Sequence, residues 1–190
     1  YFGICDINTI DYENVDLNKI DVLAKLLNVN KRVDYIIEQM NFYSFNGKKR
    51  KAIGFCVSKE HSSFMSEEFN KRGIISTHLS SNDSIDKRVE FIKKLEDENN
   101  PLEVIFTVDI FNEGVDIPSI NTVLFLRPTN SPIVFIQQLG RGLRKYKNKE
   151  FLTVLDFIGN HKKAYLIALA LAGNKAIDKD SLKLTLSNNF

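Results

Sequence analysis

The sequence predicts an open α/β sheet of parallel strands with helices on both faces. Three apolar runs, 102–108, 122–126 and 151–157, lack polar alternation, which is typical of strands buried on both sides. Amphipathic helical patterns separate the strands, as crossover connections between parallel neighbours require. With 190 residues, 43% of them hydrophobic, the chain can bury one sizeable core.

The N-terminal part is expected to be helical after an irregular start. Residues 1–15 show no clear period, whereas Asp16 and Asn30 are placed to cap a short helix through Leu27 and a longer second helix. These two helices would pack as a pair. The expected parts of the chain are an N-terminal helical extension, a main domain and a C-terminal tail, over 1–47, 48–173 and 174–190.

The main domain begins with strands and helices in alternation. Residues 52–57 and 74–79 form two short apolar runs, and Ser58 is placed to cap a helix between them that ends at Gly73. The next helix starts within 81–84, and four apolar residues mark one face of it: Ile85, Val89, Ile92 and Leu95. Two further helices are expected, one starting at Ser131-Pro132 and one over 161–172.

Charge and cysteine content exclude several classes of protein. The chain has 26 Lys and Arg against 24 Asp and Glu, so any contact with nucleic acid must come from a local patch. Its two cysteines lack metal-ligand spacing, and Cys56 lies in an apolar run, where a buried free thiol is expected in a reducing cytoplasm. No apolar stretch is long enough to span a membrane. We expect a cytoplasmic protein without a metal site of its own.

Two arginines one helical turn apart are the most informative residues. Arg141 and Arg144 follow Gln137 and Gly140, and arginines three residues apart on a helix point the same way. Two guanidinium groups on one face suit an anion with several oxygens, such as a transferring phosphoryl group. The alternative is a solvated basic helix end, because lysines follow directly. This stretch alone leaves the two interpretations level.

A second group of polar residues belongs to the strand predicted over 102–108 and the turn after it. Thr107 offers a hydroxyl to a phosphate, Gly114 allows a ligand to approach the backbone closely, and Asp116 can accept hydrogen bonds from ribose hydroxyls. In isolation this stretch is better explained as a strand followed by a turn. Combined with the two arginines, it favours a nucleotide site.

Ser58, Lys59 and His61 follow the strand predicted over 52–57. His78 and Ser80, after the second strand, are expected to add to the same phosphate contacts. Ligands gather at the carboxyl ends of the strands in open parallel sheets. We therefore expect these residues, the Thr107–Asp116 stretch and the arginine helix at one edge of the sheet. For His61, an alternative is a partly exposed residue at a helix start that contacts no ligand.

The stretches around Thr107 and around the two arginines resemble motifs of the second RecA-like domain of superfamily 2 helicases and translocases of the DEAD/DEAH type. The family's motif V, a strand ending in threonine and then a GxDIP-like turn, matches Thr107 and residues 114–118, and its motif IV resembles 53–58. The match runs over about 51–159 in the family's order, and the ending 155–160 is similar to bacterial helicases joined to accessory domains. The family's motif VI, a glutamine or histidine followed by GRxxR, matches Gln137, Gly140, Arg141 and Arg144.

The resemblance implies that two domains share the work. ATP and Mg²⁺ would be held mainly by a first RecA-like domain, because this sequence has neither a G-x-x-x-x-G-K-[ST] loop nor a DEAH-like tetrad. The chain starts at Tyr1, and the first domain is expected upstream in a longer protein. These 190 residues alone are expected to bind nucleotide weakly at most and to lack ATPase activity.

Residue roles follow from the same resemblance. Arg141 and Arg144 would stabilise charge on the γ-phosphoryl group, with Arg144 as the arginine finger, and Gln137 would orient the nucleotide. Gly114 and Asp116 would contact the nucleotide and its ribose. The residues implied to hold phosphates of one nucleic-acid strand, with DNA favoured over RNA, are Ser58, Lys59, His61 and Thr107. The alternative function is a RecA-like module that binds nucleic acid or protein without hydrolysis.

Overall fold

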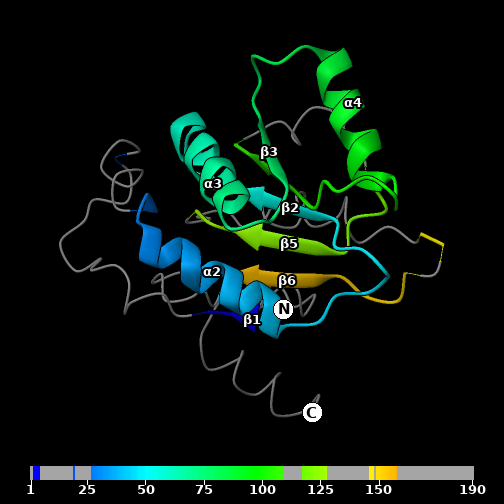
Figure 1. Cartoon of the computed structure of the whole chain (residues 1–190), viewed down its shortest axis with the longest axis horizontal. Coiled ribbons are helices and arrows are strands. Elements are labelled where there is room, and N and C mark those ends of the chain that lie inside the picture. Colours follow the sequence, from blue (N-terminus) through cyan, green and yellow to red (C-terminus); the bar gives the residue numbers. More distant parts are fainter. Residues whose placement is uncertain are drawn as a thin grey trace, which may run out of the picture.

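A computed structural model confirms the predicted parallel sheet and its flanking helices. The structure describes residues 2–4, 19, 27–108, 117–127, 146–147 and 149–157. Within them, six parallel strands form one sheet in the order β1-β6-β5-β2-β4-β3 (Figure 1). The strands are β1 (Phe2–Gly3), β2 (Ala52–Phe55), β3 (Ser76–Leu79), β4 (Val104–Thr107), β5 (Thr122–Phe125) and β6 (Thr153–Asp156). The helices are α2 (Asn30–Phe42), α3 (Lys59–Lys71) and α4 (Ile85–Glu96).

Strand β1 lies where we expected irregular structure. Phe2 and Gly3 pair in parallel with β6, and the Ile4 N–H donates to the Asp156 carbonyl at 2.7 Å. The expectation was therefore wrong for these residues, because a two-residue strand is too short to leave a period in the sequence. The remainder of 5–15, most of the helix expected over 16–27 and the helices expected from Ser131 and over 161–172 lie outside the described residues.

Helix α2 packs into the same core as the sheet. It begins at Asn30, but Val29 occupies the N-cap position and no side chain caps the helix, so the predicted capping role of Asn30 was wrong. Its apolar face, Val33, Ile36 and Met40, is buried against strand residues. The division of the chain expected after residue 47 stays a prediction.

Helix α3 has the start and end that its sequence predicts. Ser58 is the N-cap, and its hydroxyl oxygen accepts a hydrogen bond from the His61 N–H at 3.1 Å. The helix ends just before Gly73, whose φ of +81° is a conformation that glycine adopts without steric cost. Met65 and Phe69 on its inner side are completely buried.

Two hydrophobic cores cover the two faces of the sheet. Residues that alternate along each strand divide between them, so Val104 and Phe106 of β4 face α2 and α3, whereas Ile105 faces the other side. Gly54 of β2 lies beside Phe106, and a Cβ at Gly54 would come within 2.5 Å of the phenyl ring. The ring also makes an edge contact with Phe69, at 4.9 Å between centroids, so α3, β4 and β2 interlock at this glycine.

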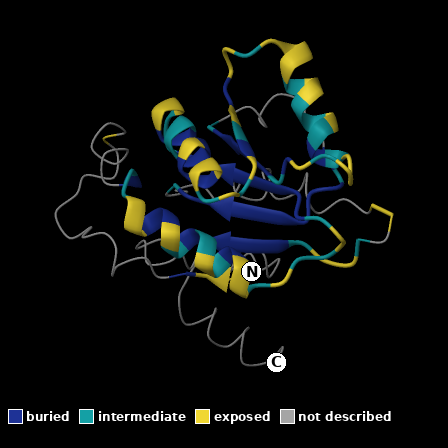
Figure 2. Cartoon of the chain, in the orientation of Figure 1, coloured by how far each residue is buried: buried dark blue, intermediate teal, exposed yellow. Residues whose placement is uncertain are grey.

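Helix α4 is much less buried than α2 or α3. In Figure 1 it lies away from the pair formed by α2 and α3, and Figure 2 shows its outer end largely exposed. Its apolar stripe begins at Ile85 and Val89, which are 74% and 43% exposed, and only Leu95 at its C-terminal end is buried. The stripe therefore meets the core through the C-terminal half of the helix, where Ile92 packs against the same cluster as Leu95. No helix in the described ranges is long and apolar enough to cross a membrane.

Candidate nucleic-acid interface

The carboxyl edge of the sheet brings together several of the predicted binding residues. Phe55 at the end of β2 pairs with Thr107 of β4 on one side and with Phe125 of β5 on the other. Two further main-chain bonds continue this alignment past the strand ends, from the Cys56 N–H to the Thr107 carbonyl and from the Leu126 N–H to the Phe55 carbonyl. Ser58 and Lys59 leave the sheet from the middle of this edge. The predicted meeting of these segments is thus confirmed for the part of the chain that the structure describes.

Ser58 and Lys59 are the two candidates that reach solvent. Ser58 is half-buried and Lys59 is exposed, and together they form the N-terminal end of α3. A helix N-terminus carries partial positive charge and unpaired N–H groups, which suits a phosphate oxygen. The Ser58 hydroxyl accepts the capping bond, and its own O–H donates to the Glu60 carboxylate. A phosphate at this end would meet the exposed Lys59 and the helix N–H groups first, and the Ser58 O–H would reach it only by leaving Glu60.

His61 is placed differently from what a phosphate contact needs. Its side chain is completely buried, and its Nδ1 accepts a hydrogen bond from the Val57 N–H at 3.3 Å. Burial, with a smaller contribution from the positive charge of Arg32, lowers the pKa of His61 to about 3. The imidazole is therefore neutral at pH 7, and it holds the turn between β2 and α3 from inside. Neither a direct phosphate contact nor the partly exposed alternative fits this position.

Thr107 is also completely buried. Because side chains alternate along a strand, its hydroxyl lies on the same face as Ile105, opposite the face that α2 and α3 cover. The Oγ has no hydrogen-bond partner among the described residues. A buried hydroxyl without a partner is uncommon in a folded chain, so this oxygen is available to a group that approaches the edge on that face.

The remaining predicted site residues lie outside the described residues. They are Gly114, Asp116, Gln137, Arg141 and Arg144. Their expected roles toward the nucleotide stay predictions. Among the described residues, no group of three His, Cys, Asp or Glu side chains converges as metal ligands.

The loop after β3 also belongs to the carboxyl edge. His78 is exposed but lies within β3 rather than after it, so its expected place was wrong. Ser80 is buried and is fixed by Asp83, whose carboxylate accepts hydrogen bonds from the Ser80 N–H at 2.7 Å and hydroxyl at 3.2 Å. Arg88 of α4 donates to the main-chain carbonyls of Ser81 and Asp83 at 2.8 and 3.0 Å. Of the two additions expected here, only His78 presents its side chain to solvent.

Two basic residues at this edge were not singled out from the sequence. Arg32 of α2 is completely buried and donates from Nη2 to the Leu126 carbonyl at 3.5 Å, and Arg127 follows β5 and is half-buried. Arg127 follows an apolar strand in the same way as Ser58, and this signal could have identified it. Arg32 gives no such signal, because a charged residue in the first turn of a helix is ordinarily exposed.

Cys56 confirms the expectation of a buried, free thiol. It is completely buried, and burial raises its pKa although the charges of Arg32 and Arg127 act in the opposite direction. Since the thiolate is the reactive form of cysteine, this side chain is a packing residue rather than a nucleophile.

Comparison with known proteins agrees with the RecA-like fold that the parallel sheet and its helices indicate. Residues 18–146 match the family described as the helicase conserved C-terminal domain. The chain is 31% identical over 157 residues to a Saccharomyces cerevisiae protein named "Putative ATP-dependent helicase IRC3". The aligned residues cover 82% of this chain and 22% of that protein. It is 30% identical over 145 residues to the type I restriction enzyme EcoKI endonuclease subunit of Escherichia coli, covering 70% of this chain and 12% of the relative.

A solved structure supports the fold independently. The E. coli DEAD-box protein SrmB, in its complex with the regulator of ribonuclease activity A, superposes with a TM-score of 0.58 at 18% identity. The superposition covers 81% of this chain and 88% of that one. Against the curated relatives the chain spans much less, 22% of the yeast protein and 12% of the restriction subunit. Because the family model matches residues 18–146, more than half of the chain's length, the chain belongs to the helicase conserved C-terminal domain family.

Proposed function

We propose that this chain is the second motor domain of an ATP-dependent helicase or translocase that acts on DNA. The observation that carries the proposal is the family match over residues 18–146, which includes both Thr107 and the Gln137–Arg144 stretch. The choice of DNA follows the relative named as a type I restriction enzyme endonuclease subunit, whereas two other relatives are named as RNA helicases. The protein is expected to work in the cytoplasm.

In this proposal the carboxyl edge of the sheet holds one nucleic-acid strand by its phosphates. Lys59 supplies a mobile positive charge, and Ser58 and the α3 N-terminus supply hydrogen-bond donors. These contacts are independent of base sequence, as a motor that moves along a strand requires. His61 takes a supporting role here, because its bond to the Val57 N–H fixes the turn that carries Ser58.

ATP and Mg²⁺ would lie between this domain and an upstream RecA-like domain, and hydrolysis of the terminal phosphoryl group would supply the energy for movement. Of this chain's own residues, Arg141 and Arg144 would stabilise negative charge on that group, Gln137 would orient the nucleotide, and Gly114 and Asp116 would contact the nucleotide and its ribose. The described part of the chain fits this arrangement in one respect. The Thr107 hydroxyl, which has no hydrogen-bond partner among the described residues, precedes the stretch that would approach the nucleotide.

The decisive experiment measures DNA-stimulated ATPase activity of the intact protein. We expect Arg144→Ala to lower the turnover number by roughly a thousandfold, the order of effect of an arginine finger. Arg144→Lys should recover little, because lysine keeps the charge but lacks the planar fork. Lys93→Ala, which removes an exposed charge on α4, is the control and should leave activity unchanged.

Two outcomes would contradict the proposal. Unchanged ATPase activity in Arg144→Ala would remove the finger assignment, and DNA binding by an intact protein without any ATPase activity would favour the non-hydrolysing module instead. Robust ATP turnover by these 190 residues alone would contradict the two-domain account.

A further inference from the structure

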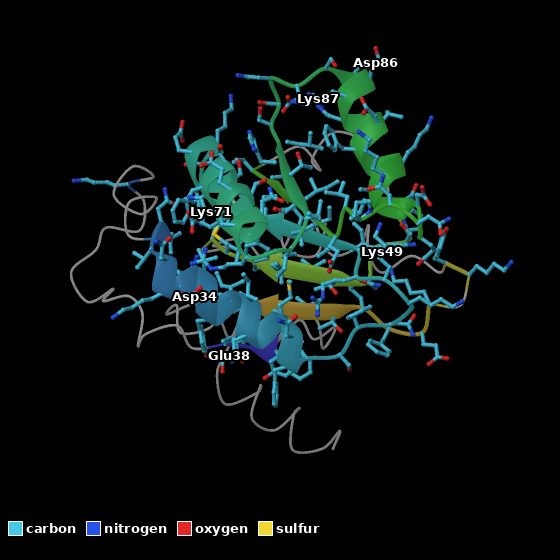
Figure 3. The ribbon with its side chains drawn as sticks, in the orientation of Figure 1. Asp34, Glu38, Lys49, Lys71, Asp86 and Lys87 are labelled. Atoms are coloured by element: carbon cyan, nitrogen blue, oxygen red, sulfur yellow. The ribbon has the colours of Figure 1, made fainter. Side chains whose placement is uncertain are left out.

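A lysine-lined hollow opens at the amino edge of the sheet, opposite the edge that carries Ser58 and Thr107. Its volume is about 280 Å³, and its walls come from the segments just before β2, β5 and β6 and from the end of α4. Figure 3 labels Lys49 beside the end of α4, on the side where the strands begin. Five lysines and one glutamate supply the charged groups of the lining: Lys48, Lys49, Lys51, Lys147, Lys149 and Glu98.

The walls of this hollow are fixed by buried polar contacts. Asn121 is 4% exposed, and its Nδ2 donates to the carbonyls of Asn46 and Lys49 at 2.7 and 2.8 Å. Its Oδ1 accepts from the Lys51 N–H at 2.8 Å. On the opposite wall, the Glu150 N–H donates to Asn46 Oδ1 at 3.1 Å. Three separate segments are thus held together, so the hollow exists before any ligand arrives.

Two of the lysines already have structural partners. Lys49 donates from Nζ to the carbonyls of Lys94, Leu95 and Asp97 at 3.4, 3.2 and 2.7 Å and so caps the C-terminal end of α4. Lys51 forms an ion pair with Glu98 at 2.5 Å. These contacts account for the positions of Lys49, Lys51 and Glu98 in the lining without a bound ligand.

The other three lysines make fewer contacts with the described part of the chain, and of these three Lys149 has a structural partner. Lys48 and Lys147 are exposed at the mouth and make no hydrogen bond or ion pair in the described part of the chain. Lys149 is half-buried and donates to the Pro118 carbonyl at 2.9 Å, and burial lowers its pKa to about 8. The lining carries five lysines against the single carboxylate of Glu98, and this excess of positive charge favours an anion in the hollow.

We propose that this hollow binds a phosphoryl oxyanion, with Lys48, Lys147 and Lys149 as its ligands. Lysine ammonium groups bind phosphate as point charges, and a phosphoryl group carries enough oxygens to meet three of them at once. A single carboxylate has less charge and fewer oxygens to share. The phosphoryl group can belong to a free polyphosphate or to a nucleic-acid backbone, because both present the same oxygens.

The test is calorimetric titration of the full chain with inorganic tripolyphosphate. The test variant is Lys48→Gln/Lys147→Gln, which removes the two lysines without structural contacts and should leave the melting temperature unchanged. The matched control is Lys31→Gln/Lys93→Gln, which removes the same charge from exposed positions on α2 and α4. We expect binding to weaken about tenfold in the test variant, since two exposed ion pairs of modest strength are lost, and by no more than about twofold in the control.

Three results would overturn the proposal. They are absence of binding by the unmodified chain, equal weakening in both double variants, and equally tight binding of a short polyglutamate peptide, which would indicate a carboxylate partner. Repeating the titrations with a short DNA duplex identifies the source of the phosphoryl group. If the test variant loses affinity for DNA as well, the backbone supplies it, and if only tripolyphosphate binding falls, the ligand is a free polyphosphate.

Discussion

Helices α3 and α4 have almost the same length and the same type of start, yet the fold uses them differently. They contain 13 and 12 residues, and each begins with a serine whose hydroxyl accepts a hydrogen bond from the main-chain N–H three residues later. Six residues of α3 are buried, against one residue of α4. Local sequence therefore sets where each helix begins, whereas the place of the helix over the sheet sets how much of it is buried.

The largest expected effect comes from truncating the main buried ring of each helix. Phe69→Ala in α3 should lower the free energy of unfolding by about 3–5 kcal/mol, because it removes a completely buried ring and leaves a cavity. Phe91→Ala in α4 should cost only about 1 kcal/mol, because its ring is half-buried. Urea denaturation measures both. Equal costs would mean that α4 is as firmly packed as α3.

A smaller effect is expected where α3 meets the sheet through Phe106. Gly54→Ala should destabilise the domain by about 1–3 kcal/mol, because the new Cβ would overlap the Phe106 ring and Phe69 limits the ring's movement. Phe106→Leu added to Gly54→Ala should recover part of the loss. If the double variant is as unstable as the sum of the two single variants, the contact is not the cause.

The buried histidine of α3 predicts a dependence of stability on pH. The pKa of His61 is about 3 in the folded chain against 6.5 ordinarily, so the unfolded state binds the proton more readily. The stabilisation is complete above pH 6.5 and is lost progressively as the pH falls toward 3. Between pH 6.5 and 5 the loss should be about 2 kcal/mol.

The control for this effect is His61→Asn, which keeps an acceptor for the Val57 N–H but does not titrate. Thermal unfolding at several pH values should give a shallower slope for the variant than for the unmodified chain. Identical slopes would mean that His61 is not the group responsible.

The smallest expected effect is also the one that α3 and α4 should share. Ser58→Ala and Ser84→Ala should each cost about 1 kcal/mol, because a capping bond depends on its own helix end and not on the burial of the helix. Aspartate at either position should restore most of the stability. A much larger loss at Ser58 would show that the cap and the core beneath it are coupled.

The sequence predicted those features that depend on neighbouring residues. The apolar runs located the four strands between the two edges of the sheet, because a strand buried on both faces leaves a continuous apolar pattern. The serine at position 58 located the start of α3, because a helix cap also leaves a local pattern. The end of this helix before Gly73 followed in the same way.

Features that depend on distant contacts were not predicted. The pairing of β1 with β6 joins residues more than a hundred positions apart, and the sequence of a two-residue strand contains no pattern that identifies its pairing strand. For His61 the sequence predicts either a phosphate contact or a partly exposed residue at a helix start, because it follows a strand. Neither holds, because its burial depends on the surrounding core. The motifs indicate the candidate site best around Arg141 and Arg144. These residues lie outside the described residues, so their role at a nucleotide site rests on the sequence alone.

The pairing of β1 with β6 has a practical consequence for anyone who shortens this chain. Removing the first four residues would strip the outer side of β6 and leave its main-chain N–H and C=O groups facing solvent. A bare strand of this kind recruits strands from other molecules. A trimmed version of the domain should therefore self-associate at concentrations where the longer chain stays dispersed.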